Sequence, residues 1–126
     1  MEREATLNDI VHSLLEERTL VDDPDWDTLS VMVAITPGVA DMTAFRYTAR
    51  APGKPTPVRS PRFDLFRRLQ ADTAAPDGTT WQVCIIRLDR ATREASVDFV
   101  YGDDAEQWRI TPASRDRIGE ALRTRG

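Results

Sequence analysis

Residues 81–88 (WQVCIIRL) and residues 95–101 (ASVDFVY) decide the fold of this chain. Both stretches are short and rich in β-branched and aromatic residues, and a polar turn separates them, so they predict a β-hairpin. The first stretch is apolar on both faces, which is typical of a strand that lies inside a sheet and is covered on both sides. We expect Trp81, Val83 and Ile85 on one face and Cys84, Ile86 and Leu88 on the other.

A second hairpin is expected nearer the N-terminus. Residues 28–36 hold an apolar run (VMVAI) that is too short for a typical helix and rich in β-branched residues, so they predict a well-buried strand. Pro37-Gly38 has the residues favoured at the two central positions of a type II turn. Residues 42–49 then alternate between two faces and predict a half-solvated strand that pairs with the first.

Helical segments flank the hairpins. Residues 2–18 carry apolar side chains at helical spacing, and Thr6 is placed to cap this segment. Residues 51–60 are rich in proline and predict a loop, after which Ser60-Pro61 has the residues favoured at a helix start. Thr111-Pro112 marks the start of the last helix in the same way. The expected apolar stripes are Leu7, Ile10, Val11, Leu14 and Leu15, then Phe63, Leu65, Phe66 and Leu69, and finally Ile118, Ala121 and Leu122.

The predicted order of elements is α-β-β-α-β-β-α. Two hairpins can join as one antiparallel sheet of about four strands packed against the helices, so the expected fold class is α+β. The chain has 126 residues, which is a common length for one domain, and we expect residues 1–126 to form it.

Composition excludes several classes of function. Hydrophobic residues make up 40% of the chain and charged residues 30%, which is too apolar for a disordered protein. Cys84 is the only cysteine, so the sequence has neither an internal disulfide nor the Cys/His spacing of a zinc site. No stretch approaches the roughly 20 apolar residues of a membrane span, and the N-terminus has no signal-length apolar run. We therefore expect a cytoplasmic protein without a membrane partner.

The net charge of −4 is unevenly distributed. Residues 1–30 carry nine acids against two arginines, residues 91–110 carry five acids against two arginines, and residues 51–70 carry five bases against one acid. Solvated surface is one explanation for these runs. The alternative is an acidic face that attracts a basic partner, because charge acts on association. No nucleic-acid-binding motif accompanies the basic segment, so we expect no nucleic-acid partner.

Residues that could carry catalysis are few. His12, the only histidine, falls on a surface position of the first helix. Cys84 falls mid-strand among apolar residues, where a thiol is more often a small buried hydrophobe than a nucleophile. The acidic run 22–27 lacks the glycine and glutamate of an EF-hand loop, which favours a solvated loop over a metal site. We expect no catalytic residue, no metal and no cofactor.

Three motifs follow one another along most of the chain. They are Asp25-Trp26 before the first apolar strand, residues 63–69 followed by Trp81, and residues 97–103 (VDFVYGD). In this order they resemble the YezG-like immunity proteins of bacterial toxin systems. In that family an Asp-Trp leads from the N-terminal helix into an apolar strand, a helix and a strand starting with Trp follow, and a strand of the form apolar-x-Asp-Phe-x-Tyr-Asp comes last. The order and spacing match over about residues 5–115, with Ala95 and the inserted Gly102 as departures.

The resemblance implies an immunity protein, an antitoxin that binds a cognate toxin domain and neutralises it by stoichiometric occlusion, without catalysis. It also implies a nuclease-type toxin, whose phosphate-binding active site would attract an acidic inhibitor. On charge alone, we assign the toxin-binding face to acidic residues, with two tryptophans as aromatic anchors. These candidates are Asp22, Asp23, Asp25, Trp26, Asp27, Asp103, Asp104, Glu106 and Trp108. For both tryptophans, packing at the edge of the core is the alternative.

Two other classes of function stay open. A secretion chaperone or adaptor would also be small, acidic and α+β, and a secretion apparatus encoded beside the gene would favour it, whereas a large toxin reading frame would favour immunity. A small enzyme that uses the carboxylates is the remote alternative, which His12→Ala and Cys84→Ser variants with full function would oppose.

Overall fold

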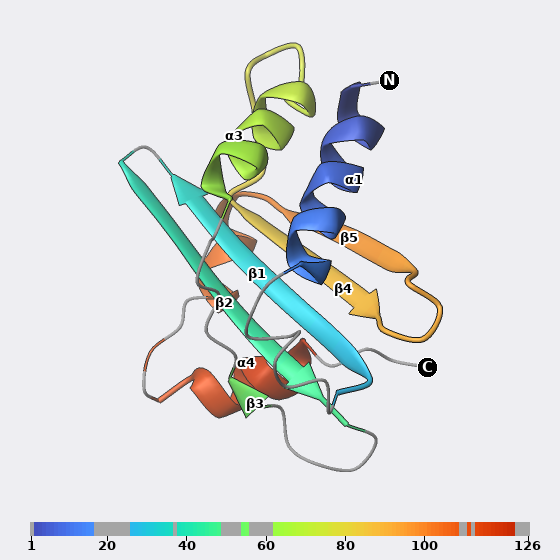
Figure 1. Cartoon of the computed structure of the whole chain (residues 1–126). Helices are drawn as coiled ribbons and strands as arrows, with labels where there is room; N and C mark the ends of the chain where they lie inside the picture. Colours follow the sequence, from blue (N-terminus) through green and yellow to red (C-terminus); the bar gives the residue numbers. More distant parts are fainter. Residues whose placement is uncertain are drawn as a thin grey trace.

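The computed structural model describes residues 2–16, 26–36, 38–48, 54–55, 62–108, 111 and 113–122 (Figure 1). Its elements are α1 (Glu2–Leu15), β1 (Thr28–Thr36), β2 (Val39–Tyr47), β3 (Lys54–Pro55), α3 (Phe63–Asp72), β4 (Val83–Asp89), β5 (Ala95–Val100), the 3-10 helix η1 (Gly102–Trp108) and α4 (Arg115–Ala121). The helices and the two long hairpins follow each other in the predicted order, which confirms the α+β class.

Within the described residues the sheet has five antiparallel strands in the order β3-β2-β1-β4-β5. The pairs β1–β2 and β4–β5 are the two predicted hairpins, and β1 joins them by pairing with β4. The short strand β3 falls inside residues 51–60, where we predicted only a loop. Proline is tolerated in β3 because an edge strand has one side of its backbone unpaired.

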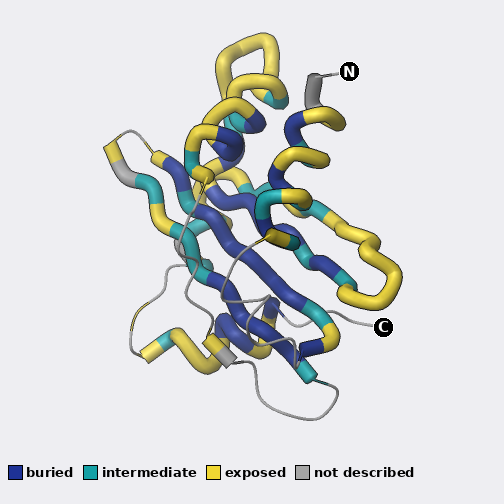
Figure 2. Tube along the Cα trace, viewed as in Figure 1, coloured by how far each residue is buried: buried dark blue, intermediate teal, exposed yellow. Residues whose placement is uncertain are grey.

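Helices cover both faces of the sheet (Figure 1). α1 and α3 lie side by side on one face, here called the α1/α3 face, while α4 and η1 pack on the other, the α4 face. Burial is concentrated along the central strands β1 and β4 (Figure 2). The core of the α1/α3 face includes Ile10, Leu14, Val31, Val33, Leu65, Phe66, Leu69, Trp81, Cys84 and Ile86, and that of the α4 face Met32, Phe45, Tyr47, Val83, Ile85, Ile118 and Leu122.

Two predicted strand faces are wrong in detail. Trp81 packs on the α1/α3 face and not beside Val83 and Ile85, because β4 begins only at Val83 and strand alternation does not extend back to residue 81. The second half of β2 is buried on both faces, not half solvated, because α4 covers its second face. The turn before β2 agrees with the prediction in that Gly38 has φ +81°, although Pro37 lies outside the described residues.

The helix starts also differ from those predicted. α1 begins at Glu2, so Thr6 is a buried position inside the helix, where its Oγ1 donates to Asp72 Oδ2 at 3.3 Å and links α1 to α3. α3 begins at Phe63 after Arg62, whose side chain makes no capping hydrogen bond. The predicted capping pair Ser60-Pro61 lies outside the described residues.

The last helix begins at Arg115, three residues later than Pro112, which is outside the described residues. Thr111 and Ser114 form a turn before it, in which Thr111 N donates to Ser114 Oγ at 2.9 Å and Ser114 N donates to Thr111 Oγ1 at 3.1 Å. This reciprocal pair is the arrangement of a capping box. Thr111 therefore has the predicted capping chemistry, one turn ahead of the helix.

Side chains of three strands hold the C-terminal end of α4 against the sheet. Ser30 Oγ donates to Leu122 O at 2.6 Å, Arg87 Nε donates to the same oxygen at 3.0 Å, and Tyr47 OH donates to Gly119 O. The last carbonyls of a helix have no partner inside the helix, so these bonds satisfy groups that would otherwise be buried alone. Gly119 is buried in this contact and Ala121 is exposed, which corrects the predicted apolar stripe.

Candidate functional site

The acidic residues assigned to a toxin-binding face are only partly described. Asp22, Asp23 and Asp25 lie outside the described residues, as does the side chain of Glu106. Asp27, Asp103 and Asp104 are exposed to solvent.

These three acids lie near opposite ends of the sheet. Asp27 precedes β1, whose first residue pairs with Asp89 at the end of β4, whereas Asp103 follows β5, whose last residue pairs with Val83 at the start of β4. The length of β4 between these positions corresponds to about 20 Å. The described acidic residues therefore lie on two separate parts of the surface and do not form one acidic face.

The two tryptophans proposed as anchors lie on opposite faces of the sheet. Trp26 is only 5% exposed and packs into the core of the α1/α3 face, with the Arg90 guanidinium 5.6 Å from its ring centroid. Its indole Nε1 has no hydrogen-bond partner among the described residues. Trp108 is half-buried against the core of the α4 face. Trp26 is thus a core residue and not an exposed anchor, which corrects its assignment.

An aromatic residue that we did not assign to the site is exposed instead. Tyr101 is 45% exposed and is the large hydrophobic side chain that the described part of the chain presents to solvent. It follows the last residue of β5, and Gly102, at φ +58°, turns the chain directly into Asp103 and Asp104. We call Tyr101, Asp103 and Asp104 the Tyr101 patch. We expected residues 95–101 to form one strand, but β5 ends at Val100. The glycine at position 102 was the signal in the sequence for this end.

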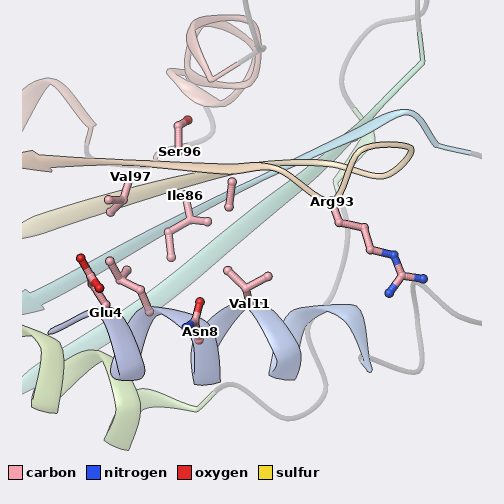
Figure 3. A pocket seen from close by; sticks show the side chains of 9 residues that line it. Glu4, Asn8, Val11, Ile86, Arg93, Ser96 and Val97 are labelled. Atoms are coloured by element: carbon pink, nitrogen blue, oxygen red, sulfur yellow. The ribbon is translucent and has the colours of Figure 1, made fainter. Parts of the chain in front are cut away.

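A groove of about 290 Å³ lies between α1 and β5 (Figure 3). Its apolar lining comes from Leu7 and Val11 of α1, Ile86 of β4 and Ala95 and Val97 of β5, and its polar lining from Glu4, Asn8, Arg93 and Ser96. We call it the α1–β5 groove. It exists because α1 packs toward α3 over the middle of the sheet and leaves the edge strand β5 only partly covered.

Cys84 is enclosed in the core of the α1/α3 face with no exposed surface. Burial raises the pKa of its thiol to about 12, and the negative charge of Asp98 adds to the rise. His12 lies on the exposed side of α1. The thiol is therefore protonated at neutral pH. Because the thiolate is the nucleophilic form, Cys84 serves as a packing residue of the core.

The raised pKa of Cys84 makes the stability of the fold depend on pH in the alkaline range. The unfolded thiol ionises near pH 9 and the folded one near pH 12, so the folded state holds its proton longer and stability falls as pH rises between these values. Above pH 9, we expect the free energy of unfolding to fall by about 1 kcal/mol per pH unit more in the wild type than in Cys84→Ala. Urea unfolding at pH 9, 10 and 11 checks this, and equal slopes for the two proteins would contradict it.

No group of three His, Cys, Asp or Glu side chains that could hold a metal ion occurs among the described residues. None of the described helices is both long enough and apolar enough to cross a membrane. No protein-family model and no curated protein sequence matches the chain.

Proposed function

We propose that this chain is a cytoplasmic immunity protein that binds a cognate nuclease-type toxin and neutralises it by stoichiometric occlusion, without catalysis. The observation that carries the proposal is the Tyr101 patch, in which an exposed tyrosine is followed along the chain, after one glycine, by two exposed aspartates. Tyrosine is enriched among the residues that dominate binding energy at protein interfaces. Carboxylates beside it would steer a basic partner into contact.

The resemblance to YezG-like proteins supports the same function from another direction. The last of the three resembling segments, residues 97–103, contains the end of β5 and the first part of the Tyr101 patch. Tyr101 and Asp103, two of the three residues of the patch, therefore lie in a segment that carries the resemblance.

Co-expression with the toxin encoded beside the gene tests the proposed function. Cells that make the toxin together with this protein should survive, and cells that make the toxin alone should die. Equal killing in both cases would overturn the proposal, and release of a secreted protein without any effect on survival would favour the chaperone alternative.

Charge reversal of the Tyr101 patch tests its role in that function. The Asp103→Lys/Asp104→Lys variant should lower the association rate with the toxin by about tenfold or more at low ionic strength, with a smaller loss at high salt. Asp41→Lys/Glu16→Lys is the matched control, since both of its positions are exposed and it changes the net charge equally. Stopped-flow or surface-plasmon measurements give the rates, and an equal loss in both variants would contradict a specific patch.

A further inference from the structure

We propose that the α1–β5 groove and the adjoining edge of β5 bind an extended segment of the partner protein, which pairs with β5 as an added strand and places one apolar side chain in the groove. The proposed function enters only in naming the toxin as the source of this segment. The binding mode itself follows from the strand edge, the lining of the groove and the charges at its two ends.

The first support is the open edge of β5. This strand is last in the sheet order, and no described segment pairs with its outer side. Asp89 N donates to Glu94 O at 2.9 Å, and the β4–β5 register then turns the backbone groups of Ser96 and Asp98 toward β4 and those of Ala95 and Val97 outward. Outward amide and carbonyl groups are the template to which an extended peptide adds as a strand.

The edge carries little of what usually prevents such pairing. Natural edge strands are often blocked by proline or by charged side chains, especially lysine. β5 contains neither proline nor lysine, and its one charged residue, Asp98, forms an ion pair with Arg87, whose Nη1 lies 2.8 Å from Asp98 Oδ2. The strand is therefore open to a partner strand at Ala95 and Val97.

The second support is the shape and chemistry of the groove. Val97 and Ile86 form its sheet side, and Leu7 and Val11 face them from α1. A volume of about 290 Å³ is at the lower end of protein pockets that bind ligands, which hold about 300–1,000 Å³. This suits one large apolar side chain better than a cofactor. Because Val97 belongs to the edge strand, a strand added there would carry its own inward side chains over the groove.

The third support is a pair of opposite charges at the two ends of the groove. Figure 3 shows Glu4 of α1 beside Val97 at one end and Arg93 of the β4–β5 turn at the other. Neither side chain forms an ion pair within the described chain. Arg93 has φ +61°, an uncommon conformation for a residue other than glycine, and its N–H donates to Asp89 O at 2.8 Å. The turn thus holds an arginine where glycine would be easier to accommodate.

These features define the chemistry of the occupant. From Glu4 to Val11 the helix advances about 10 Å, and Figure 3 shows Arg93 beyond Val11, so the span between the two charges suits the four residue steps, about 13 Å, that separate the ends of a five-residue extended segment. Side chains that share one face of a strand alternate along it. The segment therefore has a basic residue near Glu4, an apolar residue in the groove and an acidic residue near Arg93, at alternate positions.

Selection from a displayed library of random 12-residue peptides tests this binding mode without the toxin. We expect the enriched peptides to share basic, apolar and acidic residues at alternate positions, in an order set by the direction of the added strand. Their affinity for Val97→Arg, which fills the groove with a charged side chain, should be at least about tenfold weaker. No enriched pattern, or equal binding by Val97→Arg, would overturn the proposal.

Two further variants separate binding from folding. Ala95→Pro removes one outward N–H at the first residue of an edge strand, where proline is tolerated, so it should weaken peptide binding while the Tm is kept. Arg93→Gly should weaken binding about two- to fivefold and yet raise the Tm, because glycine adopts φ +61° without the cost of a Cβ. Asp41→Lys, on an exposed position of β2, is the control with unchanged affinity. Unchanged peptide binding by both Ala95→Pro and Arg93→Gly would contradict strand addition at this edge.

Amide hydrogen exchange in the toxin complex tests the source of the segment. Slower exchange at Ala95 and Val97 would assign the segment to the toxin. Protection confined to the Tyr101 patch would show that the toxin binds elsewhere, which would overturn this inference and leave the proposed function standing. Failure of the toxin to bind at all would contradict the proposed function. The peptide selection would still show whether the α1–β5 groove binds an extended segment.

Discussion

Truncation of Trp81 to alanine is expected to lower the free energy of unfolding by about 3–5 kcal/mol. The Trp81 side chain has no exposed surface and stacks on Phe99 with ring centroids 5.6 Å apart and an interplanar angle of 10°. Its Nε1 donates to Thr73 Oγ1 at 3.1 Å, and its carbonyl accepts from Gln70 Nε2 at 2.7 Å. Trp81 therefore joins α3, β4 and β5, and its loss would leave a cavity at their junction.

Urea unfolding followed by far-UV circular dichroism measures this loss. Since a small domain has a total stability of about 5–15 kcal/mol, Trp81→Ala could leave too little folded protein to analyse, and Trp81→Leu gives a measurable intermediate case. Thr73→Val removes the acceptor for Trp81 Nε1 together with the bond that Thr73 Oγ1 donates to Leu69 O at 2.7 Å, and should cost about 1–2 kcal/mol. A loss below about 1 kcal/mol for Trp81→Ala would show that its site collapses without a cavity.

Replacement of Gly119 by valine is expected to lower the free energy of unfolding by about 1–3 kcal/mol, because the added side chain overpacks the contact between α4 and β2. A Cβ at this position would lie 3.1 Å from Cε1 of Phe45, whose side chain is 2% exposed. Carbonyls at the same helix end accept hydrogen bonds from Ser30, Tyr47 and Arg87. An outward shift of α4 would therefore stretch these hydrogen bonds as well.

A double-mutant cycle identifies the cause of the loss. In a Phe45→Ala background the valine side chain has space, so the cost of Gly119→Val should shrink or change sign. Exposed Ala121, two residues along, is the matched control, and Ala121→Val should cost only the difference in helix propensity, below about 0.7 kcal/mol. An equal loss of unfolding free energy on Gly119→Val in both backgrounds would show that the valine side chain does not clash with Phe45.

The parts of the fold that the sequence predicts are those with strong local patterns. The apolar runs of β1 and β4 and the helical spacing of Ile10 and Leu14 require burial wherever they lie, so the strands, the helices and the α+β class follow from them. The face of Trp81 and the buried Gly119 do not follow, because each depends on an element remote in the sequence. β3 depends on pairing of only two residues with β2, which leaves no periodic pattern to detect.

The candidate site was predicted less well, for a related reason. Charge in a sequence shows that acids are present but does not show which of them share a surface, and Asp27 proves to lie at the opposite end of the sheet from Asp103. Trp26 was indistinguishable by composition from an exposed aromatic residue. The α1–β5 groove depends on where α1 packs relative to the edge strand β5, so no local sequence pattern predicts it.

The contacts at the end of α4 have a consequence for the order in which the chain folds. Ser30 and its acceptor Leu122 are 92 residues apart, and Tyr47 and Gly119 are 72 residues apart. During synthesis α4 leaves the ribosome after β1, β2 and β4 have been made. Because the donors come from three strands, they converge on α4 only after these strands have paired. We therefore expect α4 to dock on the sheet late in folding. Substitutions that weaken its contacts should raise the unfolding rate more than they lower the folding rate.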